Sequence, residues 1–144
     1  MEIKIRRLTI DDYPKMKEIW EKSGLPYKPK GRDSYEEIKK QMEDFGDLFL
    51  GAEIDNKLVG LIIGSSDGRK GWLNRIAVDP VYQGRGIAKM LTTACEEALK
   101  ERGIKIFAVL IESYNKNSLA LAEKMGYVLH KDIFYLTKRE SEEI

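Results

Sequence analysis

The stretch NRIAVDPVYQGRGIAKMLTTACEEALKERG, residues 74–103, joins a strand pattern to a helix pattern through a short loop with two glycines. Proline removes a hydrogen-bond donor and disfavours helical backbone in the residue before it, so Asp79 and Pro80 end the strand. Apolar side chains then recur at helical spacing, which predicts a helix over residues 87–101. The loop offers Gly84 and Gly86 but no Ser, Thr, Asp or Asn that would cap the first turn of this helix.

The uncapped helix start has a chemical consequence. Its first backbone N–H groups have no partner within the helix, and the helix dipole places partial positive charge there. Amides of this kind, approached through glycines, form a binding site for phosphate or another anion. A tight turn is the alternative, and for an isolated pair of glycines it is the usual interpretation. The loop lacks the third glycine of a dinucleotide fingerprint and the Gly-Lys-Ser/Thr of a Walker loop.

The spacing Gln83-x-x-Gly86-x-Ala88 resembles the Gln/Arg-x-x-Gly-x-Gly/Ala signature of the GNAT superfamily of N-acetyltransferases. In that superfamily, this strand, loop and helix hold the pyrophosphate of coenzyme A. A second segment, NKNSLALAEKMGY at residues 115–127, resembles the family's Asn-x-x-Ala-x-x-Leu-Tyr-x-Lys-x-Gly-Phe segment. Both segments stand in the family's order and at its separation. The resemblance therefore covers nearly the whole chain and implies an acetyl-CoA-dependent enzyme.

The resemblance also implies which residues contact coenzyme A. The backbone amides of residues 84–89 are expected to hold the pyrophosphate, and a strand edge at residues 76–78 is expected to pair with the pantetheine arm. Asn115 is expected to contact that arm while it caps a helix. For Lys89, a solvated position on the helix face stays an open alternative. The expected contacts are Ile76, Ala77, Val78, Gln83, Gly84, Arg85, Gly86, Ile87, Ala88, Lys89 and Asn115.

The general acid of the family is missing from this sequence. Ala122 occupies the position of the family tyrosine that protonates the leaving thiolate. A thiol with a pKa of about 8.5 leaves moderately well without help, so the loss lowers the rate without abolishing transfer. Tyr114 and Tyr127 lie nearby in the sequence and are candidates for the same role, with a packing role as the alternative for each.

The general base is equally unsettled. The family's glutamates on strands four and five correspond to Trp72 and Leu110 in this chain. Glu112 is the remaining carboxylate, on the same face of its predicted strand as Leu110 and at the strand's mouth. Asn74 is a candidate for holding a water molecule. A solvated surface position is the alternative for Glu112.

Cys95 and His130 are interpreted as structural residues. Cys95 falls beside the apolar stripe of its helix, which is typical of a buried small side chain, so the amine is expected to attack acetyl-CoA directly in a ternary complex. A single cysteine excludes an internal disulfide and favours a reducing cytoplasm. One cysteine and one histidine also exclude a cluster-type zinc site, so no metal is expected.

The order of predicted elements indicates an α/β fold with one domain over residues 1–144. It mixes hairpins with crossovers, which predicts a mixed sheet of six to seven strands with helices on both faces. By resemblance to the family, strands four and five are splayed. The expected strands are residues 2–9, 48–54, 57–66, 72–78, 104–112 and 127–138, and the expected helices follow residue 12 and cover residues 34–45, 87–101 and 115–126.

Composition narrows the classes of partner. Lys and Arg number 25 against 24 Asp and Glu, a net charge of +1, so no global field indicates nucleic acid or an anionic membrane. The N-terminus lacks the apolar run of a signal peptide, and no segment approaches a membrane span, which predicts a cytoplasmic protein. The expected partner is an amine-bearing small molecule or protein, and a homodimer stays open.

A basic loop follows the first predicted helix. The loop PYKPKGR, residues 26–32, carries three positive charges and one aromatic residue, and by family analogy such loops shape the acceptor site. A mobile, solvated loop is the alternative.

The missing tyrosine at Ala122 also supports a second functional class, a non-catalytic module that binds acyl-CoA as a sensor or regulator.

Overall fold

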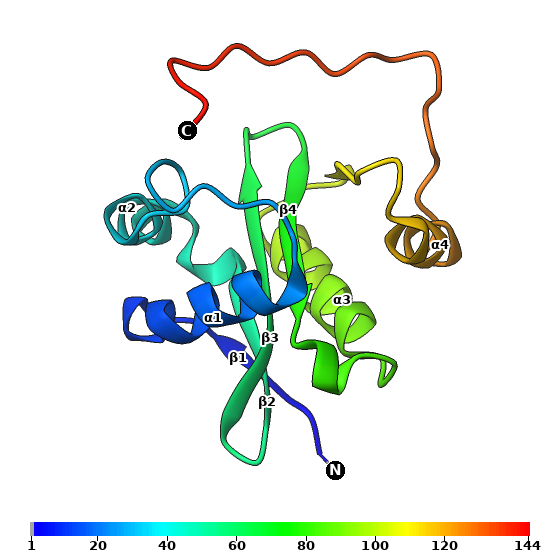
Figure 1. Cartoon of the computed structure of the whole chain (residues 1–144). Coiled ribbons are helices and arrows are strands. Elements are labelled where there is room, and N and C mark those ends of the chain that lie inside the picture. Colours follow the sequence, from blue (N-terminus) through cyan, green and yellow to red (C-terminus); the bar gives the residue numbers. More distant parts are fainter. Residues whose placement is uncertain (1) are drawn as a thin grey trace.

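The computed structural model describes residues 2–144 and contains a five-stranded mixed sheet between two layers of helices (Figure 1). The sheet order is β1-β2-β3-β4-β5; the first four strands are antiparallel to their neighbours, and β5 is parallel to β4. The strands are β1 (Lys4–Arg7), β2 (Phe49–Ile54), β3 (Lys57–Ser66), β4 (Gly71–Val78) and β5 (Phe107–Val109). The helices are α1 (Tyr13–Ser23), α2 (Tyr35–Phe45), α3 (Ile87–Glu101) and α4 (Lys116–Lys124), with short 3-10 turns at Ile10–Asp12, Gly46–Leu48 and Pro80–Tyr82.

The central strands are apolar on both faces because each face is covered by helices. On β3, Leu61 and Ile63 pack with the buried side chains of α1 and α2, whereas Ile62 packs with those of α3. This alternation follows from the two-residue period of a strand. None of the helices in the described chain, residues 2–144, is long and apolar enough to cross a membrane.

Glycines let α3 lie close to the sheet. A Cβ atom on Gly64 would lie 2.7 Å from Sγ of Cys95, and one on Gly71 would lie 2.5 Å from Cδ1 of Leu99. Interiors are close-packed, so these contacts fix the height and direction of the helix over the sheet. The start of α3 is thereby held beside the end of β4. Cys95 is fully buried in this layer, as the sequence predicts.

The sheet has fewer strands than the six to seven predicted. The predicted strand at residues 104–112 shortens to the three residues of β5, and residues 127–138 form no strand. Instead, the C-terminal arm, residues 128–144, leaves α4 as extended chain and crosses to the opposite side of the molecule (Figure 1). His130 lies exposed in this arm, and its predicted place in a strand is wrong because residues 127–138 form none. Apolar and β-branched residues show only that a segment can pair, because strand formation depends on a neighbouring strand.

Candidate active site

Strands β4 and β5 part from each other halfway along β4. Their parallel pairing ends at Leu73 and Val109, while β4 continues to Val78 with hydrogen-bonded pairing to β3 alone. The predicted splay between strands four and five is confirmed. On the β5 side, residues 74–78 therefore pair with no strand of the described chain.

A β-bulge lies at the point where the strands part. Arg75 is opposite Ile63 and Leu73 is opposite Gly64, so Asn74 is an extra residue in β4 without a partner on β3. A bulge bends its strand and increases the local twist, which turns β4 away from the direction of β5. The Asn74 side chain is exposed and donates from Nδ2 to Oγ of Ser65 on β3 at 2.8 Å. The role of Asn74 as a water holder stays a prediction.

The loop between β4 and α3 has the backbone conformation that only glycine adopts readily. Gly84 and Gly86 have φ angles of +82° and +81°, in the left-handed region. A Cβ atom at either position would meet no heavy atom within 4 Å, so conformation rather than crowding requires glycine. Gly86 is the N-cap residue of α3 and provides no side-chain cap. The first amides of α3 are accordingly free of the side-chain acceptor that most helix starts use.

Three other helix starts in the described chain are capped by side chains, whereas the N-cap side chains of α1 and of the turns Ile10–Asp12 and Gly46–Leu48 make no such bond. The three capping side chains accept a hydrogen bond from a backbone N–H group two or three residues further on, at 3.0 to 3.2 Å. These N-caps are Ser34 for α2, Asp79 for the turn Pro80–Tyr82 and Asn115 for α4. What sets α3 apart is its glycine N-cap in the left-handed region, and its glycines and backbone donors suit the pyrophosphate of coenzyme A, which supports α3 as the anion-binding helix start.

Side chains around this loop add positive charge and hold its shape. Gln83 donates from Nε2 to the carbonyl oxygen of Val78 at 3.3 Å, which ties the loop to the end of β4. The Arg85 guanidinium lies 5.3 Å from the ring of Tyr82. Lys89 is exposed in the first turn of α3. The buried side chain of Ile87 belongs to the core, as expected for the start of the apolar stripe, and Ala88 packs partly against it.

A cavity of about 370 Å³ opens between the end of α1 and the start of α4. Tyr114 is 70% exposed at this cavity, and Asn115 lies beside it as the cap of α4. The predicted capping role of Asn115 is therefore confirmed, while its contact with pantetheine stays a prediction. The cavity is lined by Ser23, Gly24, Leu25, Tyr114, Asn115, Lys116 and Asn117.

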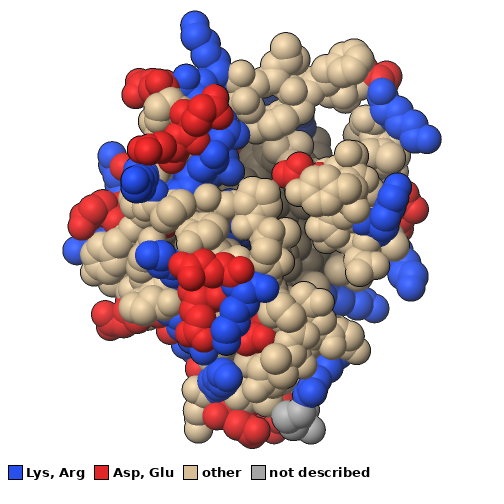
Figure 2. Space-filling model, viewed as in Figure 1, with Lys and Arg blue, Asp and Glu red and all other residues tan. Residues whose placement is uncertain are grey.

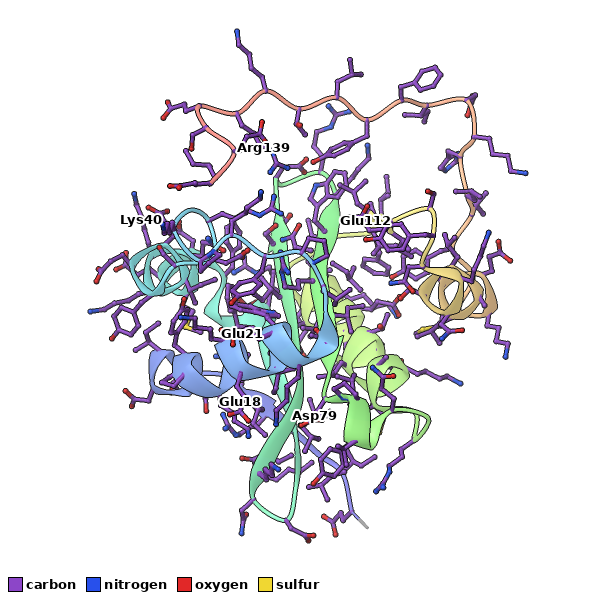
Figure 3. The ribbon with its side chains drawn as sticks, in the orientation of Figure 1. Glu18, Glu21, Lys40, Asp79, Glu112 and Arg139 are labelled. Atoms are coloured by element: carbon purple, nitrogen blue, oxygen red, sulfur yellow. The ribbon has the colours of Figure 1, made fainter. Side chains whose placement is uncertain are left out.

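Glu112 does not lie on a strand. Because β5 ends at Val109, both Leu110 and Glu112 fall in the loop that leads to α4, where Figure 3 shows Glu112. The carboxylate is exposed, and its backbone carbonyl accepts from the Asn115 N–H group at 2.9 Å to close the turn. The predicted placement at the mouth of a strand is corrected by this early strand end. A role for Glu112 as the base stays a prediction.

Tyr127 and Cys95 are both tied into the packing. Tyr127 donates from its hydroxyl to Oε2 of Glu96 on α3 at 2.5 Å, and burial together with this carboxylate raises the pKa of Tyr127 well above its usual value. Its backbone N–H also donates to the carbonyl oxygen of Ala122 at 2.9 Å, so Tyr127 anchors α4 to α3. Burial raises the pKa of the Cys95 thiol to about 12, which keeps it protonated at neutral pH. Tyr114 is thus the more accessible of the two candidate acids.

A buried ion pair fixes the α1–α2 loop, residues 24–34, to the sheet. Arg75 on β4 lies 3.2 Å from Oδ2 of Asp33, and its guanidinium is 5.5 Å from the ring of Trp20. Arg75 also donates to the carbonyl oxygen of Pro26, and the same Asp33 oxygen accepts from the Lys28 N–H group at 2.7 Å. Burial lowers the pKa of Arg75, and the Asp33 carboxylate opposes that shift. The loop is held at several points rather than loose in solvent.

Sequence reasoning did not identify this ion pair. The available signal was an arginine in a mostly apolar strand, together with an aspartate that follows a basic loop. A charged residue in such a strand needs a buried partner, since burial of an unpaired charge is strongly unfavourable. Nothing in the sequence indicated that the partner was Asp33, which lies 42 positions away.

Comparison with known proteins agrees with this geometry. Residues 5–127 match the Acetyltransferase (GNAT) family. An acetyltransferase of Sodalis glossinidius (strain morsitans) is 32% identical over 141 residues, which cover 96% of this chain and 95% of the relative. The resemblance inferred from the two short segments is confirmed.

Solved structures give the same fold over most of the chain. The PaiA N-acetyltransferase of Thermoplasma acidophilum, in complex with coenzyme A, has a TM-score of 0.80 and 25% identity, and the match covers 90% of this chain and 92% of that one. A ribosomal-protein-alanine N-acetyltransferase of Brucella melitensis biovar Abortus has a TM-score of 0.72 and 22% identity over 96% of this chain and 99% of its own. The second likeness shows the fold alone.

Proposed function

Because this chain belongs to the GNAT acetyltransferase family, an acetyl-CoA-dependent class of enzyme, we propose that it transfers the acetyl group to a primary amine by direct attack in a ternary complex. The observation that carries the proposal is the uncapped, glycine-bounded start of α3 beside the unpaired edge of β4. The acceptor amine is a protein N-terminus, a lysine or a small amine, and one domain over residues 1–144 holds the whole site.

Backbone groups do most of the binding in this proposal. The amides of residues 84–89 hold the pyrophosphate at the start of α3. The free edge of β4 at residues 76–78 pairs with the pantetheine arm as an added strand would, and Asn115 contacts the same arm. Acetyl-CoA supplies the acetyl group as a thioester when it is bound.

The residues around the opening then favour the transfer. A backbone N–H group on the free edge of β4 stabilises negative charge that develops on a carbonyl oxygen placed there. Tyr114, at the cavity beside α4, is the candidate donor of a proton to the leaving thiolate, which also leaves without an acid, and Glu112 or a water molecule held by Asn74 accepts a proton from the amine. Holding the two reacting groups together contributes a large share of the rate, so these side chains adjust it further.

A protein amine is the first acceptor class to test, because one structural neighbour is named a ribosomal-protein-alanine N-acetyltransferase. The purified protein is incubated with acetyl-CoA and, in turn, peptides with free N-termini, lysine peptides and polyamines. Free thiol release and acetylated products are measured by absorbance and mass spectrometry. Amine-dependent thiol release, with no acetyl group on Cys95, is the expected result.

The sensor hypothesis predicts a different outcome in the same experiment. It is supported by Ala122, which stands where the family has its tyrosine. Acetyl-CoA that binds tightly, without release of the coenzyme A thiol in the presence of any amine, would favour the sensor and count against an enzyme. An acetylated Cys95 peptide formed in the absence of amine would instead contradict direct attack.

A further inference from the structure

The C-terminal arm ends against the α1–α2 loop. Nζ of Lys28 donates to the carbonyl oxygen of Glu142 at 2.6 Å, and Nζ of Lys30 lies 3.9 Å from Oε1 of Glu143. These side chains and Pro29 line a cavity of about 270 Å³. In Figure 1 the arm reaches this loop after it crosses beyond the tip of the hairpin between β3 and β4, and Figure 3 labels Arg139 near its end.

The two segments carry opposite charge. The loop contributes Lys28, Lys30 and Arg32, whereas residues 140–144 of the arm, ESEEI, contribute three glutamates. Figure 2 shows acidic and basic side chains gathered together on this side of the molecule. Opposite charge brings the arm to the loop, but exposed ion pairs hold it there only weakly.

Contacts with β4 and with Asp33 hold the basic loop in one position on the sheet. The buried Asp33 carboxylate accepts from the Lys28 N–H group and pairs with Arg75 on β4, so the lysines project from a fixed segment. The other end of the loop, at Gly24 and Leu25, lines the cavity that also contains Tyr114. One fixed loop thus joins the cavity lined by Lys28 and Lys30 to the cavity that contains Tyr114.

We propose that the basic α1–α2 loop selects acceptor peptides with carboxylates close to the amine, and that the acidic end of the C-terminal arm occupies this surface in cis as a competitor. The proposal rests on the proposed transferase function, because it names the acceptor class of that site. A tethered segment needs little intrinsic affinity, since a short flexible link gives an effective concentration in the millimolar range. An acceptor peptide with comparable or higher affinity then displaces the arm.

One glycine allows the arm to be displaced without any change of charge. A Cβ atom on Gly31 would lie 2.4 Å from the carbonyl oxygen of Glu143 and 2.5 Å from Cα of Ile144, both backbone atoms. Gly31→Ala therefore forces the arm away. Gly46→Ala is the matched control, because Gly46 has φ −54° and ψ −34° and its Cβ atom would meet nothing within 4 Å.

The first measurement is binding, so it does not depend on acetyl transfer. The probes are a fluorescent peptide with glutamates beside its free amino end and the matched peptide with glutamines, each titrated against the full chain with coenzyme A by anisotropy. Hydrogen exchange of residues 139–144 reports whether the arm has moved. We expect Gly31→Ala to speed this exchange and to tighten the glutamate peptide roughly two- to fivefold, while Gly46→Ala changes neither.

Removal of the lysine charges from the loop tests the same surface. Lys28→Gln combined with Lys30→Gln should weaken the glutamate peptide several-fold and leave the glutamine peptide unchanged, and added salt should reduce the preference. Lys124→Gln, on the exposed end of α4, is the control and should have no effect. Equal affinity for the two peptides in the wild type and in Gly31→Ala would overturn the proposal.

The result is separable from that of the proposed function. Amine-dependent thiol release with neutral amines, together with no preference for the glutamate peptide, would leave the transferase standing and overturn the acidic acceptor. Arm exchange that is already fast in the wild type and unchanged in Gly31→Ala would overturn competition in cis. Preferential binding of the glutamate peptide without acetylation would support the surface and count against the transferase.

Discussion

Residues up to Ile104 and residues beyond it are packed very differently. Each buried apolar side chain in the described chain, residues 2–144, lies at or before Ile104, whereas residues 105–144 contain none that is buried. β5 is half-buried, α4 buries no residue, and the Tyr127 to Glu96 hydrogen bond joins α4 to α3. The candidate site uses both regions.

The difference separates two tasks of the site. The loop and helix start that suit the pyrophosphate belong to the densely packed region, where backbone position is fixed by the core. Tyr114, Asn115 and Glu112, the candidates for contact with pantetheine and for proton transfer, belong to the loosely packed region. Segments with few buried contacts open locally at low free energy. Pyrophosphate binding should therefore depend on the first region, and pantetheine contact by Asn115 and proton transfer on the second.

The largest expected effect is on stability, and it tests the comparison directly. Leu91→Ala removes a fully buried side chain from α3 and should lower the free energy of unfolding by about 2–5 kcal/mol. Leu121→Ala makes the same change on the half-buried face of α4 and should lower it by about 1 kcal/mol or less. Urea unfolding measures both values. Equal losses at the two positions would contradict the division into two regions.

The second prediction concerns coenzyme A affinity. Gly86→Val places a β-branched residue at a φ of +81° and puts a side chain where the backbone is proposed to meet the pyrophosphate, so affinity measured by calorimetry should fall about tenfold or more. Gly103→Val is the matched control, because Gly103 has a φ of +82° just beyond the other end of α3 and its Cβ atom would also meet nothing within 4 Å. Both variants should lose stability, and only Gly86→Val should lose affinity. Unchanged affinity in a folded Gly86→Val protein would show that the pyrophosphate site is misplaced.

The third prediction uses the buried thiol of the dense region. Burial raises the pKa of Cys95 from its ordinary 9.0 to about 12, so between these values the unfolded chain releases a proton that the folded chain keeps. The unfolded state then binds fewer protons, and the free energy of unfolding falls as pH rises, by up to about 1.4 kcal/mol per pH unit. Cys95→Ala should lack this slope between pH 9 and 10 and should keep transferase activity. A wild-type slope equal to that of Cys95→Ala would contradict a buried thiol.

The raised pKa of Tyr127 also lowers the free energy of unfolding as pH rises, but it does so both in the wild type and in Cys95→Ala. Burial is its main cause, so the phenol also stays protonated in the folded chain at a pH where the unfolded chain ionises. Its effect begins near pH 10, the ordinary value for tyrosine, and is present with or without Cys95. The difference between the two proteins below that pH therefore reports the thiol alone.

The sequence predicted the dense region better than the loose one, for physical reasons. The turn at Gly84 and Gly86 and the buried position of Cys95 follow from local rules of backbone conformation and helical periodicity. The point where β4 leaves β5 depends on the bulge at Asn74, and the fixed loop depends on the contact between Arg75 and Asp33. Such long-range contacts are set by three-dimensional packing, which local pattern does not encode.

In the loosely packed region too, local sequence pattern did not predict the structure. Residues 127–138 contain many apolar and aromatic residues, yet they form no strand, and β5 ends at Val109 although apolar residues continue to position 111. A strand exists only where a neighbour accepts its hydrogen bonds, so the apolar run overstates its length. Glu112 was consequently assigned to a strand from which the structure excludes it.

The smallest expected effect is that of Tyr114, and it tests whether catalysis depends on positioning. Tyr114 is 70% exposed in the loose region, where its hydroxyl is not held in one place by packing. A general acid contributes roughly 10²-fold to 10⁴-fold when it is well positioned. Because Ala122 replaces the family's acid and Tyr114 is poorly constrained, Tyr114→Phe should lower kcat less than tenfold.

The pH dependence of the rate should agree. The rate should rise as the acceptor amine loses its proton, near pH 8 for an N-terminal amine and near pH 10 for a lysine. It should not show the fall at high pH that an enzyme acid imposes. Tyr127→Phe provides the comparison, since it removes a packed hydroxyl and should lower stability more than Tyr114→Phe does. A hundredfold loss of kcat in Tyr114→Phe, with coenzyme A affinity intact, would show that the loose region supplies the acid after all.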